Sequence, residues 1–151
     1  MDDIDRRIVG LLTVKGRMTL SALGEAVGLS APAVHDRVHR LENTGVIRGY
    51  AALLDADLLG LGTAAMVSIT LGGDPGTRQK LEARLSEDPR VLELHEVAGD
   101  DCYVAKVRVN SPKALAALLA ELRLGFPGLT TRSMMVLRSC FEKPLGPGAA
   151  D

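Results

Sequence analysis

The stretch from residue 19 to residue 44, TLSALGEAVGLSAPAVHDRVHRLENT, constrains the fold of this chain more than any other part of the sequence. It predicts two helices joined by a tight turn. Thr19 and Ser30 are typical N-cap residues, and Gly28 between them suits the left-handed backbone that ends a helix. Pro32 is tolerated because it falls in the first turn of the second helix. Two helices joined by a short glycine-containing turn are typical of a helix-turn-helix motif.

Apolar residues recur at helical spacing in both predicted helices. The first helix carries Leu20, Leu23 and Val27 on one face, and the second carries Val34, Val38 and Leu41. Gly24 lies in the middle of the first helix, where glycine costs about 1 kcal/mol relative to alanine. We expect this cost to be accepted because the second helix crosses at close range there.

The opposite face of the second helix is polar. At about 100° per residue, it is formed by the N-terminal Ser30 and by Pro32, His35, Asp36, His39 and Arg40, with Arg37 on its flank. In a helix-turn-helix the N-terminal half of the second helix enters the major groove of DNA. An ordinary solvated face is the alternative, but such a face is usually richer in Glu and Lys pairs. We therefore expect these seven residues to contact double-stranded DNA.

Composition and charge limit the class of protein. The chain has 151 residues, 46% hydrophobic and 25% charged, which is ordinary for a soluble globular protein. No apolar run is as long as a membrane span, and the start MDDIDRR is neither a signal nor a transit peptide, so we expect a cytoplasmic protein without a membrane partner. Cys102 and Cys140 lack metal-ligand spacing, and we expect no metal and no cofactor.

A net charge of −1 is low for a protein that binds DNA. Residues 1–50 carry seven Lys/Arg against six Asp/Glu, so a single copy should attract phosphates only weakly. Several linked copies would bind more tightly, because the later contacts become intramolecular. The charge balance therefore favours an oligomer.

The remaining residues predict one more helix at the start and a different domain after residue 62. Asp2 or Asp3 can cap the first helix, whose apolar residues are Ile4, Ile8, Leu11 and Leu12. Six segments follow: a strand at 63–71, a helix at 78–86, strands at 91–97 and 102–109, a helix capped by Ser111, and a strand at 129–137. The order β-α-β-β-α-β is typical of a ferredoxin-like domain. Because the strands are apolar on nearly both sides, we expect the uncovered face of the sheet to be apolar and to form an oligomer interface.

Several segments resemble the Lrp/AsnC family of transcription regulators, also called feast/famine regulatory proteins. DDIDRRIVGLL, LGEAVGLS and VHDRVHRLENTGVIRGYAALLD resemble the amino-terminal domain of that family, while VAGDDCYVAKVRV and FPGLTTRSMMVL resemble its small-molecule-binding domain. The resemblance runs from about residue 2 to residue 142. It implies that the ferredoxin-like domains pair into homodimers, that dimers assemble into octamers, and that an amino acid binds between subunits.

The resemblance also implies an effector loop at residues 98–103. The family pattern there is Thr-Gly, two variable residues, an Asp and an aromatic or apolar residue, and this chain has AGDDCY. Gly99 is retained, but Cys102 replaces the usual Asp, so we expect Asp100 or Asp101 to bind the ammonium group of a ligand. The predicted effector residues are Gly99, Asp100, Asp101, Cys102 and Tyr103, together with Thr131 and Ser133 at the family's hydroxyl positions. The alternative is that GDD is only a hairpin turn.

Other functions are less consistent with the residues. Cys102 with His95 or His39 could form a nucleophile and base, but nothing else suggests a catalytic triad. Siroheme decarboxylases resemble the same two-domain plan, but the second domain has no basic cluster for the carboxylates of a tetrapyrrole. An oligomeric amino-acid sensor without DNA contact would be expected to have a degraded helix-turn-helix.

The sequence therefore predicts an α+β protein that is not an enzyme. Residues 1–50 are expected to form a winged-type, three-helix helix-turn-helix domain and residues 51–62 a linker. Residues 63–142 are expected to form the ferredoxin-like domain for ligand binding and oligomerisation, and residues 143–151 a tail. The predicted function is a sequence-specific DNA-binding regulator that responds to an amino acid or a related small molecule.

Overall fold

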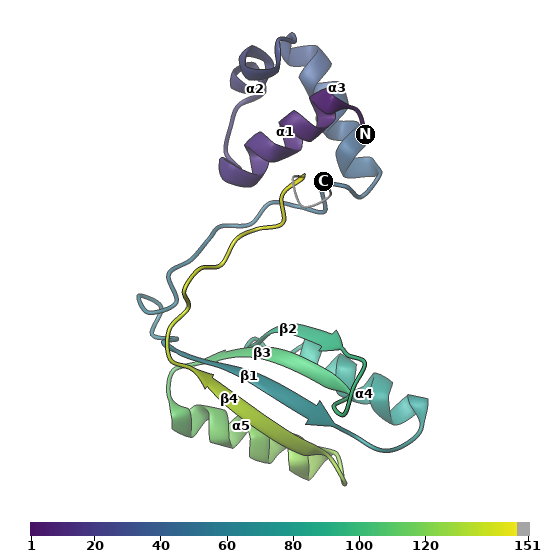
Figure 1. Cartoon of the computed structure of the whole chain (residues 1–151), viewed down its shortest axis with the longest axis vertical. Coiled ribbons are helices and arrows are strands. Elements are labelled where there is room, and N and C mark those ends of the chain that lie inside the picture. The colour runs from purple at the N-terminus through teal and green to yellow at the C-terminus, as the bar shows by residue number, and fades with distance from the viewer. Residues whose placement is uncertain (148–151) are drawn as a thin grey trace. The chain divides into compact units, whose positions relative to one another are not determined.

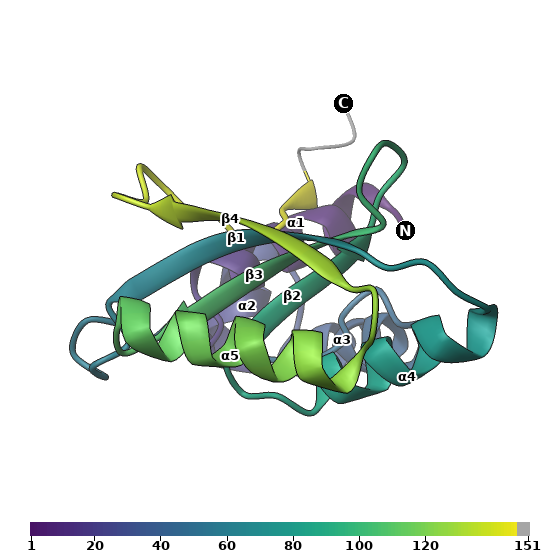
Figure 2. The same cartoon turned by 90° about the horizontal axis from the view of Figure 1, so that it is seen from below.

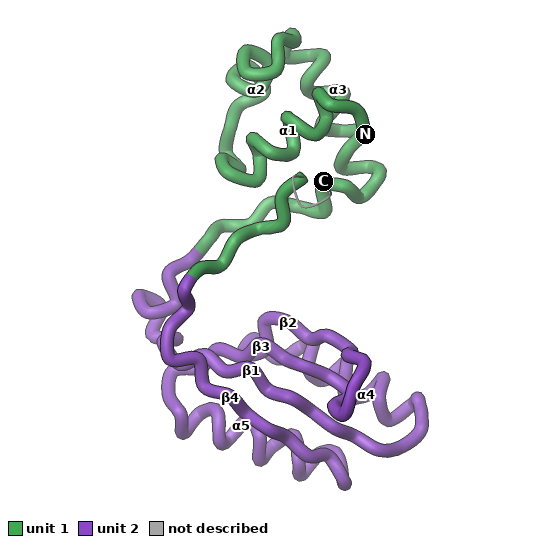
Figure 3. The backbone as a smooth tube through the Cα atoms, viewed as in Figure 1, with its two compact units in different colours: residues 1–53, 141–151 green, residues 54–140 purple. Residues whose placement is uncertain are grey.

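A computed structural model describes residues 1–147 and divides the chain into two compact units. The first unit contains residues 1–53 and the C-terminal segment from Phe141, and the second contains residues 54–140 (Figures 1 and 3). Residues 143–147, predicted as part of a separate tail, thus belong to the first unit. No helix of the described residues has both the length and the apolar character to cross a membrane.

The first unit is built from three helices, α1 (Asp3–Val14), α2 (Leu20–Val27) and α3 (Ala31–Asn43). Asp2 caps α1 by accepting a hydrogen bond from the backbone N–H of Asp5 at 2.8 Å. Thr19 and Ser30 cap α2 and α3 as predicted, and Gly28 adopts the predicted left-handed backbone at φ 78°. Residues 46–53 after α3 form no strand, so the wing of a winged-type domain is not formed there.

The predicted apolar faces meet in the core of the first unit. Its buried residues are Ile8, Leu23, Val27, Val34, Val38 and Leu41. Leu20, which was predicted to join them, lies at the surface instead. The core is entirely aliphatic, and it fixes which face of α3 points outward.

Gly24 is buried because the turn after α2, rather than α3 itself, approaches it closely. A Cβ atom at this position would lie 2.5 Å from the carbonyl oxygen of Leu29. The backbone N–H groups of Gly28 and Leu29 also donate to the carbonyl oxygen of Gly24, at 2.8 and 2.9 Å. The predicted close approach is confirmed, but its predicted partner was wrong, because the chain turns back on α2 before α3 begins.

The second unit has the predicted order of elements: β1 (Thr63–Thr70), α4 (Pro75–Ser86), β2 (Val91–Glu96), β3 (Tyr103–Val109), α5 (Pro112–Gly125) and β4 (Thr130–Val136). The strands form one antiparallel sheet in the order β2-β3-β1-β4. Figure 2 shows α4 and α5 together on one face of this sheet. Helix α4 starts earlier than predicted because Asp74 caps it and Pro75 suits its first turn. The ferredoxin-like, α+β fold class is confirmed.

Alternate residues of the two central strands point toward the helices. The core contains Ala65, Val67 and Ile69 of β1, Tyr103, Ala105 and Val107 of β3, and Leu81, Leu85, Leu115, Leu118 and Leu122 of the helices. An ion-pair cluster around the buried Asp88 lies on the same side of the sheet. The Asp88 carboxylate accepts hydrogen bonds from Arg84 and Arg90, both at 2.8 Å, and Arg90 also bonds Glu121 of α5 at 2.6 Å. Arg90 and then Arg84 hold the pKa of Asp88 well below its usual range, against the effect of burial.

The uncovered face of the sheet is mixed rather than apolar. Strand register aligns Met66 of β1 with Lys106 of β3 and with Met134 of β4, and Lys106 in turn with Glu93 of β2. The Lys106 ammonium lies 3.5 Å from the Glu93 carboxylate. The prediction of an apolar open face was therefore wrong for β2 and β3. The two-residue alternation of these strands places Glu93 and Lys106 on that face, whereas Glu96, opposite the buried Tyr103, lies on the helical side near Arg78.

We predict opposite effects for alanine at two helical glycines of the first unit. Gly24→Ala should destabilise the unit by about 1–3 kcal/mol, because its Cβ atom would collide with the Leu29 carbonyl oxygen. Gly10→Ala in α1 should stabilise it by about 0.5–1 kcal/mol, because the new Cβ atom would lie an ordinary 3.5 Å from Pro147. Urea unfolding followed by helical circular dichroism measures both. A Gly24→Ala chain as stable as the wild type would contradict the close approach.

Candidate nucleic-acid interface and effector loop

The predicted polar face of α3 is exposed. Pro32, His35, Asp36, His39 and Arg40 all lie at the surface, opposite the buried Val34, Val38 and Leu41. Ser30 is also exposed, and its hydroxyl accepts a hydrogen bond from the backbone N–H of Ala33 at 3.4 Å. A shallow depression of about 300 Å³ lies between Asp36, His39, Arg40, Asn43 and Thr44. The core packing thus presents one continuous polar surface, which we call the outer face of α3.

The two histidines of this face lie one helical turn apart. Their ring centroids are 6.1 Å apart, with an interplanar angle of 89°. Nδ1 of His35 lies 3.4 Å from the Asp36 carboxylate, and Nδ1 of His39 lies 2.7 Å from the side-chain nitrogen of Asn43. These contacts order both rings and are made on the Nδ1 side of each ring.

Two carboxylates, one from the N-cap residue Asp2 and one from Asp5 of α1, bind the arginines of α3. Arg37 Nη1 donates to Asp2 Oδ2 at 2.6 Å and to Asp5 Oδ1 at 2.8 Å. Arg40 Nη2 donates to Asp5 Oδ1 at 3.0 Å and to Asp5 Oδ2 at 2.9 Å. The Asp5 side chain is only 3% exposed, whereas those of Arg37 and Arg40 are 25% and 56% exposed. Arg37 is therefore mainly a link between helices, while Arg40 also reaches the surface.

These contacts favour the charged forms of Asp2, Asp5 and Arg37. Burial acts to raise the pKa of Asp5, but the Arg37 guanidinium, the Asp2 backbone N–H and Arg40 outweigh it and hold that pKa below its usual value. Arg37 likewise lowers the pKa of Asp2, and both carboxylates raise the pKa of Arg37. Two negative and two positive charges cancel, so this part of the surface contributes little net charge toward DNA.

Sequence reasoning missed this cluster because its partners are 32 to 35 residues apart in the chain. One local signal was present. Asp5 is three residues before the buried Ile8 and four before the partly buried Val9, so it lies on the inward face of α1. A carboxylate at such a position is rarely buried without a charged partner.

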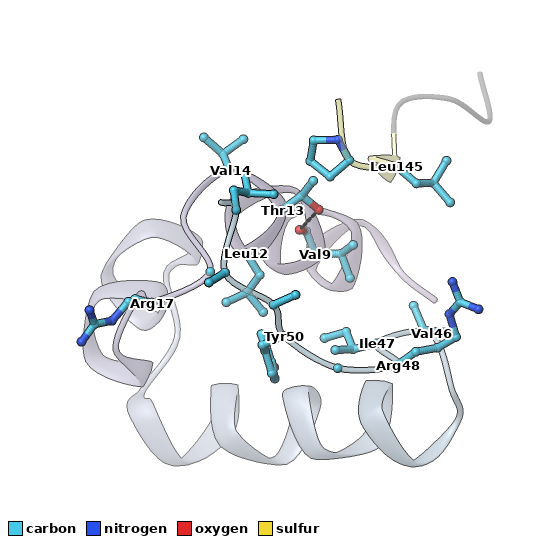
Figure 4. A pocket seen from close by; sticks show the side chains of 16 residues that line it. Val9, Leu12, Thr13, Val14, Arg17, Val46, Ile47, Arg48, Tyr50 and Leu145 are labelled. Carbon is cyan, nitrogen blue, oxygen red and sulfur yellow. Dashed lines mark hydrogen bonds between the residues drawn. The ribbon is translucent and has the colours of Figure 1, made fainter. Parts of the chain in front are cut away.

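The first unit also contains an apolar groove that the sequence did not predict. It has a volume of about 790 Å³ and lies between the end of α1, residues 46–53 and the C-terminal segment (Figure 4). Its lining includes Val9, Leu12, Ile47, Tyr50 and Leu145. The Tyr50 hydroxyl donates to Glu42 at 2.9 Å, which fixes the ring against the end of α3.

The predicted effector loop joins β2 to β3. Gly99 has φ 146°, and the loop is closed by a hydrogen bond from Val97 N–H to the Cys102 carbonyl at 3.0 Å. Cys102 and Tyr103 are directed inward. The Cys102 thiol lies 3.7 Å from the Leu71 carbonyl oxygen, and the buried Tyr103 hydroxyl donates to Glu82 at 2.7 Å. That bond and burial raise the pKa of Tyr103 to about 12.

The other predicted effector residues lie on different sides of the sheet. Asp101 accepts hydrogen bonds from Thr70 at 3.3 Å and from Arg132 at 2.8 Å, on the uncovered face. Asp100 is exposed. Thr131, on the helical side, accepts a hydrogen bond from Arg123 of α5 at 2.5 Å, and Ser133 is exposed on the edge strand β4. Within one chain, the seven residues therefore do not surround a common pocket.

The described residues do not assemble the enzyme site that the sequence left open. His95 is directed to the uncovered face, where Nε2 lies 3.2 Å from Glu93, whereas Cys102 packs against the core. The hydrogen bonds recorded for residues 1–147 include none between a cysteine and a histidine. Over the same residues, no group of three or more His, Cys, Asp or Glu side chains is arranged to hold a metal ion.

A helix-turn-helix unit followed by a ferredoxin-like unit defines a class of two-domain DNA-binding regulators. Residues 1–42 match the AsnC-type helix-turn-helix domain, and residues 64–145 match the Lrp/AsnC ligand binding domain. The chain belongs to the Lrp/AsnC family of transcriptional regulators.

Relatives with known names agree with this assignment. The chain is 40% identical to the HTH-type transcriptional regulator LrpA of Mycobacterium tuberculosis, over 94% of this chain and 93% of the relative. It is 37% identical to the leucine-responsive regulatory protein of Escherichia coli K12, over 91% of this chain and 85% of the relative.

Two solved structures are similar over nearly the whole chain. The feast or famine regulatory protein of M. tuberculosis complexed with L-methionine has a TM-score of 0.86 and 40% identity, and covers 93% of this chain and 95% of its own. A transcriptional regulator of Neisseria meningitidis in complex with L-Met has a TM-score of 0.88 and 26% identity, and covers 95% and 94%.

We predict that Asp5 makes the first unit sensitive to acid. Because its pKa is lower in the folded chain than the usual value of about 3.9, its contribution to stability is present above about pH 4 and is lost as the pH falls. Asp5→Asn should destabilise the unit by about 1.5–3 kcal/mol at pH 7, and the difference from the wild type should shrink toward pH 3. Thermal unfolding between pH 7 and pH 3 measures this. Asp3→Asn, in the same helical turn but exposed, should follow the wild type.

Proposed function

We propose that this regulator binds double-stranded DNA through the outer face of α3, acts as a homo-oligomer, and responds to an amino acid bound by its ferredoxin-like unit. The observation that carries the proposal is the continuous exposed surface of Pro32, His35, Asp36, His39 and Arg40 on the second helix of a helix-turn-helix. Helices in this position dock in the major groove, where side chains can reach base edges.

Within this face, the residues differ in the contacts they can make. His35 and His39 have ring nitrogens that can bond a base edge or a phosphate. Asp36 can accept a hydrogen bond from the amino group of cytosine but is repelled by phosphates. Ser30 and Pro32 are at the start of α3, the end that lies deepest in the groove. Arg37 is withdrawn into its bonds with Asp2 and Asp5 and supports the helix from behind.

Assembly into at least a dimer, and into an octamer as the family resemblance implies, follows from weak DNA attraction by one copy. The net charge of −1 and the neutral cluster around Asp5 both reduce the attraction between one chain and phosphates. Paired chains would present two copies of α3 to neighbouring major grooves. The apolar part of the uncovered sheet face, which includes Met66 and Met134, is the surface we assign to this pairing.

DNA selection tests the binding surface and the assembly together. Duplexes enriched from a random pool by the full chain should contain two related half-sites about 10–10.5 base pairs apart, because a symmetric dimer presents its helices one turn apart.

Asp36→Ala should relax the preference at a single cytosine by about 1–3 kcal/mol, measured by fluorescence anisotropy. Glu25→Ala, which removes a charge from the exposed side of α2, is the control. Uniform tightening on every sequence by Asp36→Ala would contradict the cytosine contact, and single half-sites would contradict the dimer.

An amino acid is the ligand class that the effector loop fits. Asp100 offers an exposed carboxylate for an ammonium group, and Gly99 permits close approach of the backbone. Arg132, held by Asp101 on the uncovered face, offers a guanidinium for a carboxylate. Residues such as Thr131 and Ser133 would complete the site from a neighbouring subunit. The L-methionine complexes of the two similar regulators support this ligand class.

A thermal-shift screen of the twenty amino acids tests the effector. A ligand at 100 times its dissociation constant adds about 2.7 kcal/mol of stability. Asp100→Asn and Asp101→Asn should each reduce that stabilisation, whereas Glu87→Gln, on the exposed end of α4, should not. If the double variant at residues 100 and 101 keeps full ligand stabilisation, the loop is only a hairpin turn.

The named relatives are transcriptional regulators, and we propose that this chain likewise acts without catalysis in the cytoplasm. The inward direction of Cys102 supports the absence of a nucleophile. A visible absorption band in the purified protein would instead favour the siroheme-decarboxylase alternative. An intact helix-turn-helix argues against a sensor that does not contact DNA.

A further inference from the structure

Asp5 lies outside α3, yet it contacts the most exposed arginine of the outer face. Both oxygens of its carboxylate accept hydrogen bonds from a single nitrogen, Nη2 of Arg40, at 3.0 and 2.9 Å. More than half of the Arg40 side chain remains exposed beyond that contact. Arg40 is therefore bound to α1 through Nη2 while its side chain stays accessible to solvent.

The Asp5 contact and the position of Arg40 on α3 together limit how Arg40 can contact DNA. Arginine reads a guanine by donating two parallel hydrogen bonds, and each such pair combines Nη2 with either Nη1 or Nε. Asp5 competes for Nη2, and Arg40 lies in the last turn of α3, away from the N-terminal half that enters the groove. Single charge-assisted donors suit a phosphate oxygen, which carries no information about sequence.

Asp5 is itself held firmly, and independently of Arg40. Its Oδ1 accepts from Arg37 Nη1 at 2.8 Å, and its Oδ2 accepts from the backbone N–H of Asp2 at 3.2 Å. Arg37 Nη1 also donates to the Asp2 carboxylate at 2.6 Å, so the arginine that binds Asp5 is itself held in place. A fixed, buried carboxylate can orient a mobile surface guanidinium, because only the latter loses rotamer freedom.

We propose that Asp5 is a positioning residue for DNA binding. It holds Arg40 in the orientation that contacts a phosphate, so Arg40 contributes affinity but not sequence discrimination. This inference rests on the proposed binding of DNA by the outer face of α3.

Whether removal of the Asp5 charge tightens or weakens DNA binding distinguishes a positioning role from simple charge repulsion. A carboxylate close to phosphates repels them, so removing its charge alone should tighten DNA binding. Loss of positioning should weaken binding, because Arg40 would then have to be ordered by the DNA. Asp3 is in the same turn of α1, is exposed, and makes no ion pair within the described part of the chain, so Asp3→Asn reports the effect of charge alone.

The first measurement concerns Arg40. On a duplex enriched by the wild-type chain and on a scrambled duplex, Arg40→Ala should weaken binding by the same factor, about tenfold for one charge-assisted hydrogen bond. The slope of log affinity against log salt should become shallower by about 0.9, the value for one phosphate. A loss confined to the enriched duplex, with relaxed preference at one guanine, would overturn the proposal. Because Arg40 also pairs with the buried Asp5, thermal unfolding of the variant checks that a weakened fold does not cause the loss.

The second measurement is a double-mutant cycle. Asp5→Asn should weaken binding to both duplexes several-fold, whereas Asp3→Asn should leave it unchanged or tighten it. In the Arg40→Ala background, Asp5→Asn should cause no further loss. Tightening by Asp5→Asn, or an equal loss in both backgrounds, would overturn the proposal. Circular dichroism confirms that each variant is folded. If the wild-type chain enriches no duplex, the proposed DNA-binding function itself fails. If the wild-type chain does enrich a duplex but the variants behave otherwise than expected, only the positioning role of Asp5 fails.

Discussion

The buried carboxylate of Asp5 is the interaction on which the first unit depends. A charged group this deep is tolerated only when its hydrogen-bonding capacity is satisfied, and Arg37, Arg40 and the Asp2 backbone satisfy it. The same contacts join the beginning of α1 to the middle of α3. Aliphatic packing determines which face of α3 is outward, but such packing is tolerant of small rotations. Directional ion pairs restrict the rotation that packing leaves open, so the position of the outer face is set partly by α1.

Local rules were enough to predict most of the elements. Thr19, Ser30 and Ser111 cap helices as their side-chain chemistry requires, and Gly28 ends α2 with a positive φ. The apolar spacing of Val34, Val38 and Leu41 identified the buried face of α3, and therefore also its exposed face. The order of strands and helices followed from changes in apolar period. These features depend on neighbours a few residues away, which the sequence displays directly.

Contacts between distant residues were not predictable in the same way. The charged residues of β2 and β3 are visible in the sequence, but their pairing depends on the register between the strands, so the Glu93–Lys106 pair on the uncovered face was missed. The effector loop was identified by resemblance, but the sequence could not show that Tyr103 bonds Glu82 or that Asp101 bonds Arg132. Those pairs depend on tertiary packing. If these residues form the proposed ligand site, that site must draw them from more than one chain, since one chain directs them to different sides of its sheet.

The neutral cluster of Asp2, Asp5, Arg37 and Arg40 also bears on regulation. If the arginines of α3 were unpaired, a single chain would bind DNA of any sequence more strongly. Tethering several copies would then add less discrimination between sites with one half-site and sites with several. Under the proposed assembly, with two of its positive charges cancelled, each copy of α3 contributes a small free energy, and useful affinity arises only when several copies bind together. Affinity then depends steeply on the number and spacing of linked copies. A ligand at a site between chains could therefore change DNA binding strongly by a modest change in assembly, without altering any residue on the outer face of α3.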